Sequence, residues 1–333
     1  MVDLFAEAPG GFYERFDLTG PVQHVSSARA GEILRDLEEL QEKEPPPVPP
    51  PVYRAGGGAA TAAKIAAGLG IGAAFAGALG GSSQGADPLG RLFERDLTRR
   101  GTALHLVYGK DPTGVCITLT IGKDRRIAAS PGAALEFSAG DIPEKQARGA
   151  KLLLLDGYML DRAELVRRFF ELAPAAALDA GSASIIRAQA GKLIAYFKSR
   201  PFLLFVNEEE AAALYCALAG GGAFPKAAAL EDFLRELCGG APGSCIVLKQ
   251  GERGARVFRG KTVFRAKTQA LEPEHTAGAG DAFAGGFLAG FLQNKTPEEC
   301  AALGNRTAGE FLAPPGPAGS PEFTEFRGFA KSS

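Results

Sequence analysis

The second half of the sequence alternates short apolar runs with longer amphipathic segments, and this alternation restricts the folds open to the chain. The apolar runs are residues 152–155, 175–178, 202–206 and 246–249. The segments of helical length that follow them are residues 162–172, 188–198 and 208–218, with two more at 282–292 and 300–312. Short runs that are apolar on both faces are typical of parallel strands covered by helices. The sequence therefore predicts an α/β fold with a mostly parallel central sheet and helices on both faces.

The first half of the chain mixes helical and strand patterns. An amphipathic helix is predicted at residues 28–42, where Leu and Ile recur at three- and four-residue steps. Further helices are expected at residues 59–68 and 88–100, and strands at 73–78, 104–108, 115–120 and 126–128. The turns at residues 109–114 and 122–124 predict that the last three strands form an antiparallel β insert. No second core is evident, so we expect one domain over residues 1–333.

Charge and composition exclude several classes of function. Lys plus Arg total 37 and Asp plus Glu total 38, so a net charge of −1 provides no field for binding a nucleic acid polymer. No basic start followed by an apolar run marks a secretory signal. The uncharged stretch Ile65–Gly81 is short for a membrane span, and we interpret it as a helix followed by a buried strand. Five scattered cysteines favour free thiols and a cytoplasmic location.

One glycine-rich segment carries the strongest chemical signal. Thr276-Ala277-Gly278-Ala279-Gly280-Asp281 leads directly into the predicted helix at 282–292. Glycines at a helix start allow a tight turn, and the N–H groups of the first turn bind anions. A carboxylate beside such an anion site is suited to act as a base that takes a proton from a hydroxyl attacking phosphorus. Asp281 is the candidate, although a plain helix N-cap explains the same residues.

Two further segments follow predicted strands. Asn207-Glu208-Glu209-Glu210 comes after the run 202–206, at the strand end where open α/β sheets bind ligands. Its carboxylates suit the hydration shell of Mg²⁺, and an ordinary capped helix start explains them equally well. The second segment runs from Lys249 to Ala255 with glycines at 251 and 254, a turn where a nucleotide could lie or a plain β-turn.

Together these segments resemble the ribokinase-like (PfkB) family of carbohydrate and nucleoside kinases, and its adenosine-kinase-like bacterial branch most closely. The family's D-T-x-G-A-G-D signature corresponds to His275–Asp281, its N-x-x-E motif to Asn207–Glu210, and its early G-G motif to Gly56-Gly57. The segments at residues 87–90, 112–114 and 156–161 are also similar in order and spacing. The resemblance covers nearly the whole chain and implies a ribokinase-like fold, in which residues of about 10–26 and 102–130 form a small β lid.

The resemblance also implies a role for each matching residue. Asp281 would be the catalytic base, and the amides of Gly278, Ala279 and Gly280 would form the anion hole. The nucleotide would contact Asn207, Glu210, Lys249, Gly251, Gly254, Thr276 and Asn305. The substrate pocket would include Asp3, Gly57 and Thr61. Glu210 would hold Mg²⁺ through water, ATP would be the phosphoryl donor, and a monovalent cation is a further candidate cofactor. The expected partner is a sugar or nucleoside, bound by a monomer or a homodimer.

Three departures from the family pattern bear on the substrate. Asp3 is almost the first residue, so the strand that usually precedes the early Asp is expected to be missing or to lie upstream. Thr61 stands where the family has Asn, and a hydroxyl reaches less far than an amide. His275 replaces the first Asp of the signature, which removes a negative charge near the phosphates. None of these changes Asp281 or the glycines before it.

The sequence leaves two alternatives open. The departures motivate a second hypothesis, a degenerate, non-catalytic member of the same fold that binds a sugar or nucleotide without turnover. The segment Gly68-Leu69-Gly70-Ile71-Gly72 suggests a dinucleotide site, but its spacing is not G-x-G-x-x-G. The identity of the acceptor is not encoded in any motif.

Overall fold

The computed structural model describes residues 1–20, 22–43, 48–220, 224–268 and 277–312. The chain divides into two compact units. The first comprises Met1–Ala60 and Ala74–Asp141, and the second comprises Thr61–Ala73 and the chain from Ile142 onward. The expectation of a single domain with a lid stays a prediction. Helix α3 (Gly58–Gly68) begins in the first unit and continues in the second.

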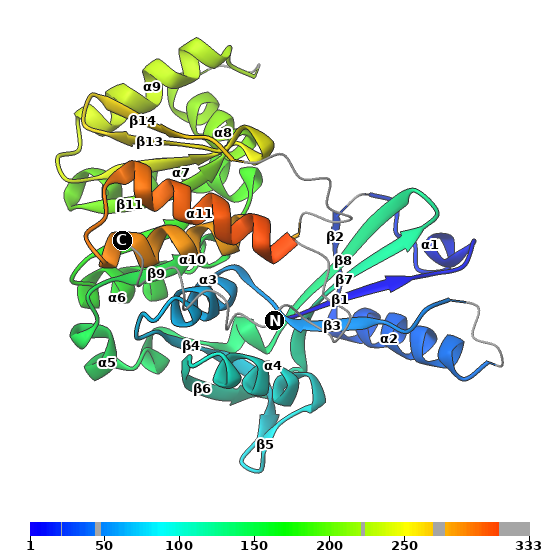
Figure 1. Cartoon of the computed structure of the whole chain (residues 1–333). Coiled ribbons are helices and arrows are strands. Elements are labelled where there is room, and N and C mark those ends of the chain that lie inside the picture. The colour runs from blue at the N-terminus through cyan, green and yellow to red at the C-terminus, as the bar shows by residue number, and fades with distance from the viewer. Residues whose placement is uncertain (21, 44–47, 221–223, 269–276, 313–333) are drawn as a thin grey trace. The chain divides into compact units, whose positions relative to one another are not determined.

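The first unit contains a five-stranded sheet in the order β2-β8-β7-β1-β3 (Figure 1). Its strands are β1 (Val2–Glu7), β2 (Val22–His24), β3 (Val52–Ala55), β7 (Thr113–Ile121) and β8 (Asp124–Gly132). Strand β1 pairs with β7 in parallel and with β3 in antiparallel orientation. Asp3 therefore lies inside a paired strand, and the expectation that this strand is missing is wrong. Its hydrogen-bond partners β3 and β7 lie far along the chain, so no local pattern marked this strand.

Opposite faces of this sheet differ in composition. The face covered by α2 (Ser27–Gln41) carries the buried residues Leu4, Ala6, Val115, Ile117, Leu119 and Ala128. Phe12 and Phe16, in and after the short α1 (Phe12–Arg15), join this core. Side chains alternate between faces along a strand, so Asp3, Phe5, Cys116 and Thr118 lie on the other face. Ser26 caps α2 by accepting a hydrogen bond of 3.2 Å from the Arg29 N–H.

A second sheet in the first unit has three strands in the order β5-β4-β6. Strand β4 (Ala74–Ser82) is parallel to β6 (Ala103–Gly109) and antiparallel to β5 (Gly85–Ala86), and α4 (Pro88–Arg99) connects the strands. The predicted antiparallel insert is confirmed for β7 and β8. It is wrong for β6, which pairs with β4 in another sheet because the helix between them makes a parallel crossover.

The D-P-L-G and P-T-G segments form one buried polar network. Asp87 caps α4, accepting from the Gly90 N–H at 2.7 Å. The same carboxylate accepts from the Thr113 N–H at 2.7 Å and from its hydroxyl at 2.8 Å. The Thr113 hydroxyl in turn accepts from the Gly80 N–H at 2.9 Å. This network joins β4, α4 and β7, so these two segments have a structural role in the first unit.

The second unit is built on a six-stranded sheet in the order β14-β13-β12-β11-β10-β9. The four parallel strands are β9 (Leu153–Asp156), β10 (Ala176–Asp179), β11 (Phe202–Asn207) and β12 (Cys245–Lys249). Two antiparallel strands, β13 (Ala255–Arg259) and β14 (Thr262–Ala266), extend one edge. The mostly parallel sheet is confirmed, whereas the hairpin of β13 and β14 was not predicted.

Helices cover both faces of this sheet (Figure 1). Helices α10 (Ala279–Leu292) and α11 (Pro297–Leu312) adjoin the face that contains Leu203, Phe205 and Val247. The buried residues that alternate with these, such as Leu204 and Ile246, belong to the other face. The strands also contact α7 (Ala183–Ser199), α8 (Glu208–Ala219) and α9 (Ala227–Gly239). Helix α9 was not predicted.

Glycines bring α10 close to its neighbouring helices. A Cβ on Gly285 would lie 2.6 Å from the Ala62 carbonyl oxygen and 2.8 Å from the Ile65 Cβ in α3. A Cβ on Gly286 would overlap the Thr307 hydroxyl in α11. Larger residues would push these helices apart, since core packing leaves no room for extra atoms. This packing fixes α10, and with it the position of its first turn in the unit.

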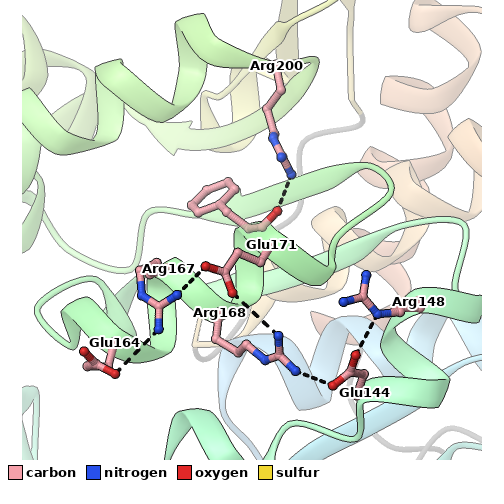
Figure 2. A network of polar contacts seen from close by, with 8 residues as sticks. Glu144, Arg148, Glu164, Arg167, Arg168, Glu171 and Arg200 are labelled. Atoms are coloured by element: carbon pink, nitrogen blue, oxygen red, sulfur yellow. Dashed lines mark hydrogen bonds and ion pairs between the residues drawn. The ribbon is translucent and has the colours of Figure 1, made fainter.

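An ion-pair network joins α5 (Glu144–Gly149) to α6 (Ala163–Leu172), as Figure 2 shows. Glu144 pairs with Arg148 in its own helix at 2.8 Å and with Arg168 in α6. Arg168 also lies 3.6 Å from Glu171. These side chains are largely exposed, and exposed ion pairs contribute about 0–1 kcal/mol each. The network is therefore a minor source of stability.

The structure also bears on the predictions for the cysteines and for the uncharged stretch. All five cysteines are free thiols, as expected. The stretch Ile65–Gly81 is divided between α3 and β4. Within the ranges that the structure describes, no helix combines the length and the apolar character needed to cross a membrane.

Candidate active site

Four neighbouring parallel strands of the second unit end in polar residues. These residues are Asp156 on β9, Asp179 on β10, Asn207 on β11 and Lys249 on β12. Asp156 is the register partner of Asp179, and Asn207 is that of Lys249. Parallel strands bring their carboxyl ends to one edge, which is where open α/β sheets bind ligands. This edge is the candidate active site.

Helix α10 begins beside this edge at the predicted glycine segment. Gly278 is the N-cap residue, with φ 81° and ψ −5°, a left-handed conformation that favours glycine. A Cβ there would also lie 2.8 Å from the Phe311 ring. Ala279, Gly280 and Asp281 form the first turn, whose N–H groups have no acceptor within a helix. The prediction of a helix start at this segment is confirmed, and Thr276 and His275 lie outside the described residues.

Lys249 brings a positive charge to the start of α10. Its Nζ donates to both carboxylate oxygens of Asp179, at 2.7 and 2.9 Å, and the two side chains are only 14% and 11% exposed. A Cβ on Gly280 would lie 3.2 Å from the Lys249 Nζ. Burial alone would lower the pKa of Lys249, but the nearby carboxylates of Asp179, Glu210 and Asp281 together raise it above its ordinary value. The ammonium is therefore held in its charged form.

Asn207 and Glu210 form a reciprocal cap at the start of α8. The Asn207 side chain accepts from the Glu210 N–H at 2.8 Å, and the Glu210 carboxylate accepts from the Asn207 N–H at 2.8 Å. Burial raises the pKa of Glu210, which is 4% exposed, while Lys249 and the Asn207 N–H oppose this shift. The interpretation as a helix cap is thus confirmed for these two residues. It leaves one carboxylate oxygen of Glu210 outside the cap.

The glycine turn after β12 is separate from the Lys249 side chain. Gly254 has φ 85°, and a Cβ there would overlap the Ala266 carbonyl oxygen at the end of β14. Asn305 is buried in α11 and donates to the carbonyl oxygens of Ala266 and Lys267, at 3.1 and 3.2 Å. The structure therefore brings Gly254 and Asn305 together at the end of β14, in agreement with the prediction that they are neighbours. Gly251 begins the same turn.

Sequence reasoning missed two contacts at this site. Asp179 carried no motif, although its position at the C-terminal end of a parallel strand is a signal that could have identified it. Glu208 accepts from the Gln250 side chain at 2.9 Å and pairs with Arg253, which joins the first turn of α8 to the glycine turn. Only folding brings these residues together, because more than forty positions separate Glu208 from Gln250.

The described residues hold no cluster of three His, Cys, Asp or Glu side chains suited to a metal ion. Mg²⁺ seldom needs such a cluster, because it usually keeps several waters and binds through one or two carboxylates together with phosphate oxygens. A single buried carboxylate with an oxygen outside the cap, as in Glu210, fits that mode of binding.

The predicted substrate residues fall in both units. In the first unit, Asp3 and Gly56 are neighbours, since a Cβ on Gly56 would overlap the Asp3 carboxyl group. Gly57 follows with φ 89°. Asp3 also contributes, after burial, to raising the pKa of its register partner Cys116 to about 12. Thr61 belongs to the second unit, where it is buried in α3.

The glycines at residues 68–72 follow a helix and precede a strand, since α3 ends at Gly68 and β4 starts at Ala74. A dinucleotide fingerprint has the opposite order, in which glycines follow a strand and open a helix. This segment is therefore a connection, and Gly70, with φ 84°, makes its turn.

Known proteins share this fold and sequence pattern. The family model for pfkB family carbohydrate kinases matches residues 27–322. An uncharacterized sugar kinase of Archaeoglobus fulgidus is 26% identical over 253 residues, which are 73% of this chain and 92% of that protein. A cytidine kinase of Thermococcus kodakarensis is 36% identical over 118 residues, which are 34% of this chain and 38% of that protein. The crystal structure of adenosine kinase from Sinorhizobium meliloti has a TM-score of 0.79 at 23% identity, over 99% of this chain and 96% of that one.

The chain belongs to the pfkB family of carbohydrate kinases, because the family model matches most of its length. The likeness to the Sinorhizobium structure shows that its fold is the ribokinase-like α/β fold that the sequence predicted. The class of protein is thus a kinase of this family.

Proposed function

We propose that this protein transfers a phosphoryl group from ATP to a primary hydroxyl of a sugar or nucleoside. The observation that carries the proposal is the start of α10, where Gly278 opens the helix and Asp281 lies in the first turn beside the Lys249 ammonium. A helix N-terminus with a fixed cation attracts phosphate, and a carboxylate in the same turn is suited to accept a proton.

Each group in this site has a distinct task in the proposed reaction. Asp281 accepts the proton of the substrate hydroxyl as that oxygen attacks the terminal phosphorus, the bond from this phosphorus to the bridging oxygen breaks, and ADP leaves. The N–H groups of Gly278, Ala279 and Gly280 donate to the oxygens on which negative charge develops. Glu210 would hold Mg²⁺ through water, and the bound ion would neutralise charge on the phosphates. The turn at Gly251–Gly254, with Asn305, flanks the nucleoside of ATP.

The proposed acceptor follows from the first unit and from relatives. Asp3 offers a carboxylate on the sheet face opposite α2, and a carboxylate is an acceptor for the paired hydroxyls of a sugar ring. Gly57 and Thr61 complete the proposed substrate contacts. The names of the relatives cover a sugar kinase, a cytidine kinase and an adenosine kinase, so both free sugars and nucleosides belong in the panel of acceptors.

The direct test is ADP release from Mg-ATP in the presence of single acceptors. The panel consists of adenosine, cytidine, the other nucleosides, ribose, fructose and further sugars, with a reaction lacking acceptor as the background. We expect one class of acceptor to raise ADP release well above this background and to yield a phosphorylated product. If Mg-ATP binds and no member of the panel is phosphorylated, the non-catalytic alternative replaces this proposal.

The same assay tests the remaining cofactor predictions. Omission of Mg²⁺ is expected to abolish turnover, because the phosphate charges then lack their counter-ion. Replacing K⁺ by a large organic cation at constant ionic strength tests the monovalent cation. Thermal shift with NAD in place of Mg-ATP is expected to give no stabilisation, given the order of elements around residues 68–72.

A further inference from the structure

Lys249 and Asp179 form a buried charge pair that crosses the end of β11. The two residues end β12 and β10, and β11 lies between those strands in the sheet. Seventy positions separate them along the chain. Removing two charges from water is costly, and apolar residues of similar size would join the strands at lower cost. A purely structural link therefore explains this pair poorly.

The surroundings of Lys249 indicate what the charge does. Three carboxylates lie close enough to influence its ammonium, those of Asp179, Glu210 and Asp281. A phosphate that approached these carboxylates alone would be repelled, because all the charges have the same sign. One cation fixed among them reduces this repulsion and places a charge of the opposite sign beside the first turn of α10.

The direction of the Lys249 side chain is the second observation. An ammonium carries three N–H groups, and two of them bind Asp179. The Nζ lies beside Gly280, in the first turn of α10, whereas the glycine turn that follows Lys249 in sequence contacts Ala266 at the end of β14. The lysine head is thus at the turn that contains Asp281, and its backbone leads to the turn proposed for the nucleoside.

We propose that Lys249 binds the terminal phosphoryl group of the nucleotide, and that Asp179 is the positioning residue that holds its ammonium beside the first turn of α10. The inference rests on the proposed function and assigns Lys249 to the phosphoryl end of ATP instead of the nucleoside end. Asp179 acts through Lys249 and does not touch the nucleotide.

The experiment compares the binding of Mg-ADP with that of Mg-AMP-PNP, a non-hydrolysable analogue that retains the terminal phosphoryl group. Dissociation constants are measured by calorimetry for the parent protein and for Lys249→Met. We expect Lys249→Met to weaken AMP-PNP binding by about tenfold or more, because a charge-assisted hydrogen bond is lost. The ADP constant is expected to change less than about threefold.

A second variant guards against damage from an unpaired buried charge. Lys249→Met alone leaves the Asp179 carboxylate without its partner, which destabilises a protein. The double variant Asp179→Asn with Lys249→Met removes both charges and should show the same selective loss of AMP-PNP binding. Asp179→Asn alone should weaken AMP-PNP binding in the same direction but less, because the ammonium is present and no longer fixed. Lys192→Met, an exposed change on α7, is the matched control.

The outcomes separate the possible roles of Lys249. An equal loss of ADP and AMP-PNP affinity would mean that Lys249 contacts the nucleoside or the inner phosphates, and unchanged constants in the folded double variant would mean a structural link. Either result overturns the inference. Failure of the proposed function looks different, because the parent protein itself would then bind neither nucleotide, or would bind Mg-ATP and phosphorylate no acceptor.

Discussion

Helices α8 and α10 both start in the second unit with an acidic residue at the third position of the first turn, but their N-caps differ. In α8 that acid is Glu210, which reaches back to its own N-cap residue, while Asn207 accepts from the Glu210 N–H. In α10 the acid is Asp281, and the N-cap residue is Gly278, which has no side chain to offer. One helix start binds its own side chains, whereas the other presents its N–H groups.

We therefore assign different roles to the two helix starts: that of α8 stabilises the fold, and that of α10 is proposed to take part in the reaction. The reciprocal cap of α8 satisfies two N–H groups locally and fixes Glu210 at the carboxyl end of β11. The glycine N-cap of α10 provides no such local hydrogen bond, and its first turn lies next to Lys249, where we propose that phosphate binds. A change at Asp281 in α10 should therefore reduce turnover more than stability, whereas a change at the Asn207 cap of α8 should act mainly on stability.

The largest expected effect is at Asp281. Asp281→Asn keeps the size of the side chain and removes the base, so we expect kcat to fall on the order of 10²–10⁴-fold, with modest change in nucleotide affinity. Steady-state ADP release measures it, with the acceptor that the panel assay identifies. Asp232→Asn, an exposed acid on α9, is the control and should leave kcat unchanged. Full turnover in Asp281→Asn would remove the base from the proposed mechanism.

The next prediction tests the backbone conformation of the N-cap of α10. Gly278→Ala forces a left-handed residue and a close contact with the Phe311 ring, so we expect a loss of roughly 1–2 kcal/mol in unfolding free energy. Denaturant unfolding monitored by circular dichroism gives the value. Gly240→Ala is the matched control, because Gly240 has φ −86° and room for a Cβ. Equal stability of the two variants would show that the glycine is dispensable for the fold.

A smaller loss of stability is expected for a change at the N-cap of α8. Asn207→Ala removes the side-chain acceptor for the Glu210 N–H, which should cost about 1 kcal/mol of unfolding free energy. Asn207→Ser retains an acceptor at this position and should recover most of that stability. If Asn207→Ala is as stable as the parent, the reciprocal cap contributes nothing and the contrast with α10 loses its basis.

The smallest effect concerns pH and Glu210. Burial raises the pKa of Glu210 in the folded chain, so its contribution to stability is present below the unfolded pKa and is lost as the pH rises through the folded pKa. Glu210→Gln removes this titration and keeps an oxygen for the Asn207 N–H. We therefore expect the unfolding free energy of the variant, relative to the parent, to be higher near about pH 7 than near about pH 4. Exposed Glu209→Gln is the control, and a difference that falls with rising pH would contradict the assignment.

Much of this unit could be read from sequence because its elements are local. The runs around Leu154, Leu178 and Leu204 are apolar on both faces, and the helices between them have apolar residues at helical spacing. The reciprocal cap of α8 needs only residues three positions apart. Strand β1 was missed because its neighbours β3 and β7, which provide its hydrogen bonds, lie far along the chain.

The sequence by itself determined the type and approximate position of many elements, since caps, glycine turns and hydrophobic periods act over a few residues. It thereby predicted a helix start at Gly278–Asp281, which the structure confirms. Only the tertiary structure decided that β6 pairs with β4 instead of β7, and that Lys249 meets Asp179. The physical reason is that strand order and the packing of α10 depend on the burial of the whole sheet, which no short segment encodes.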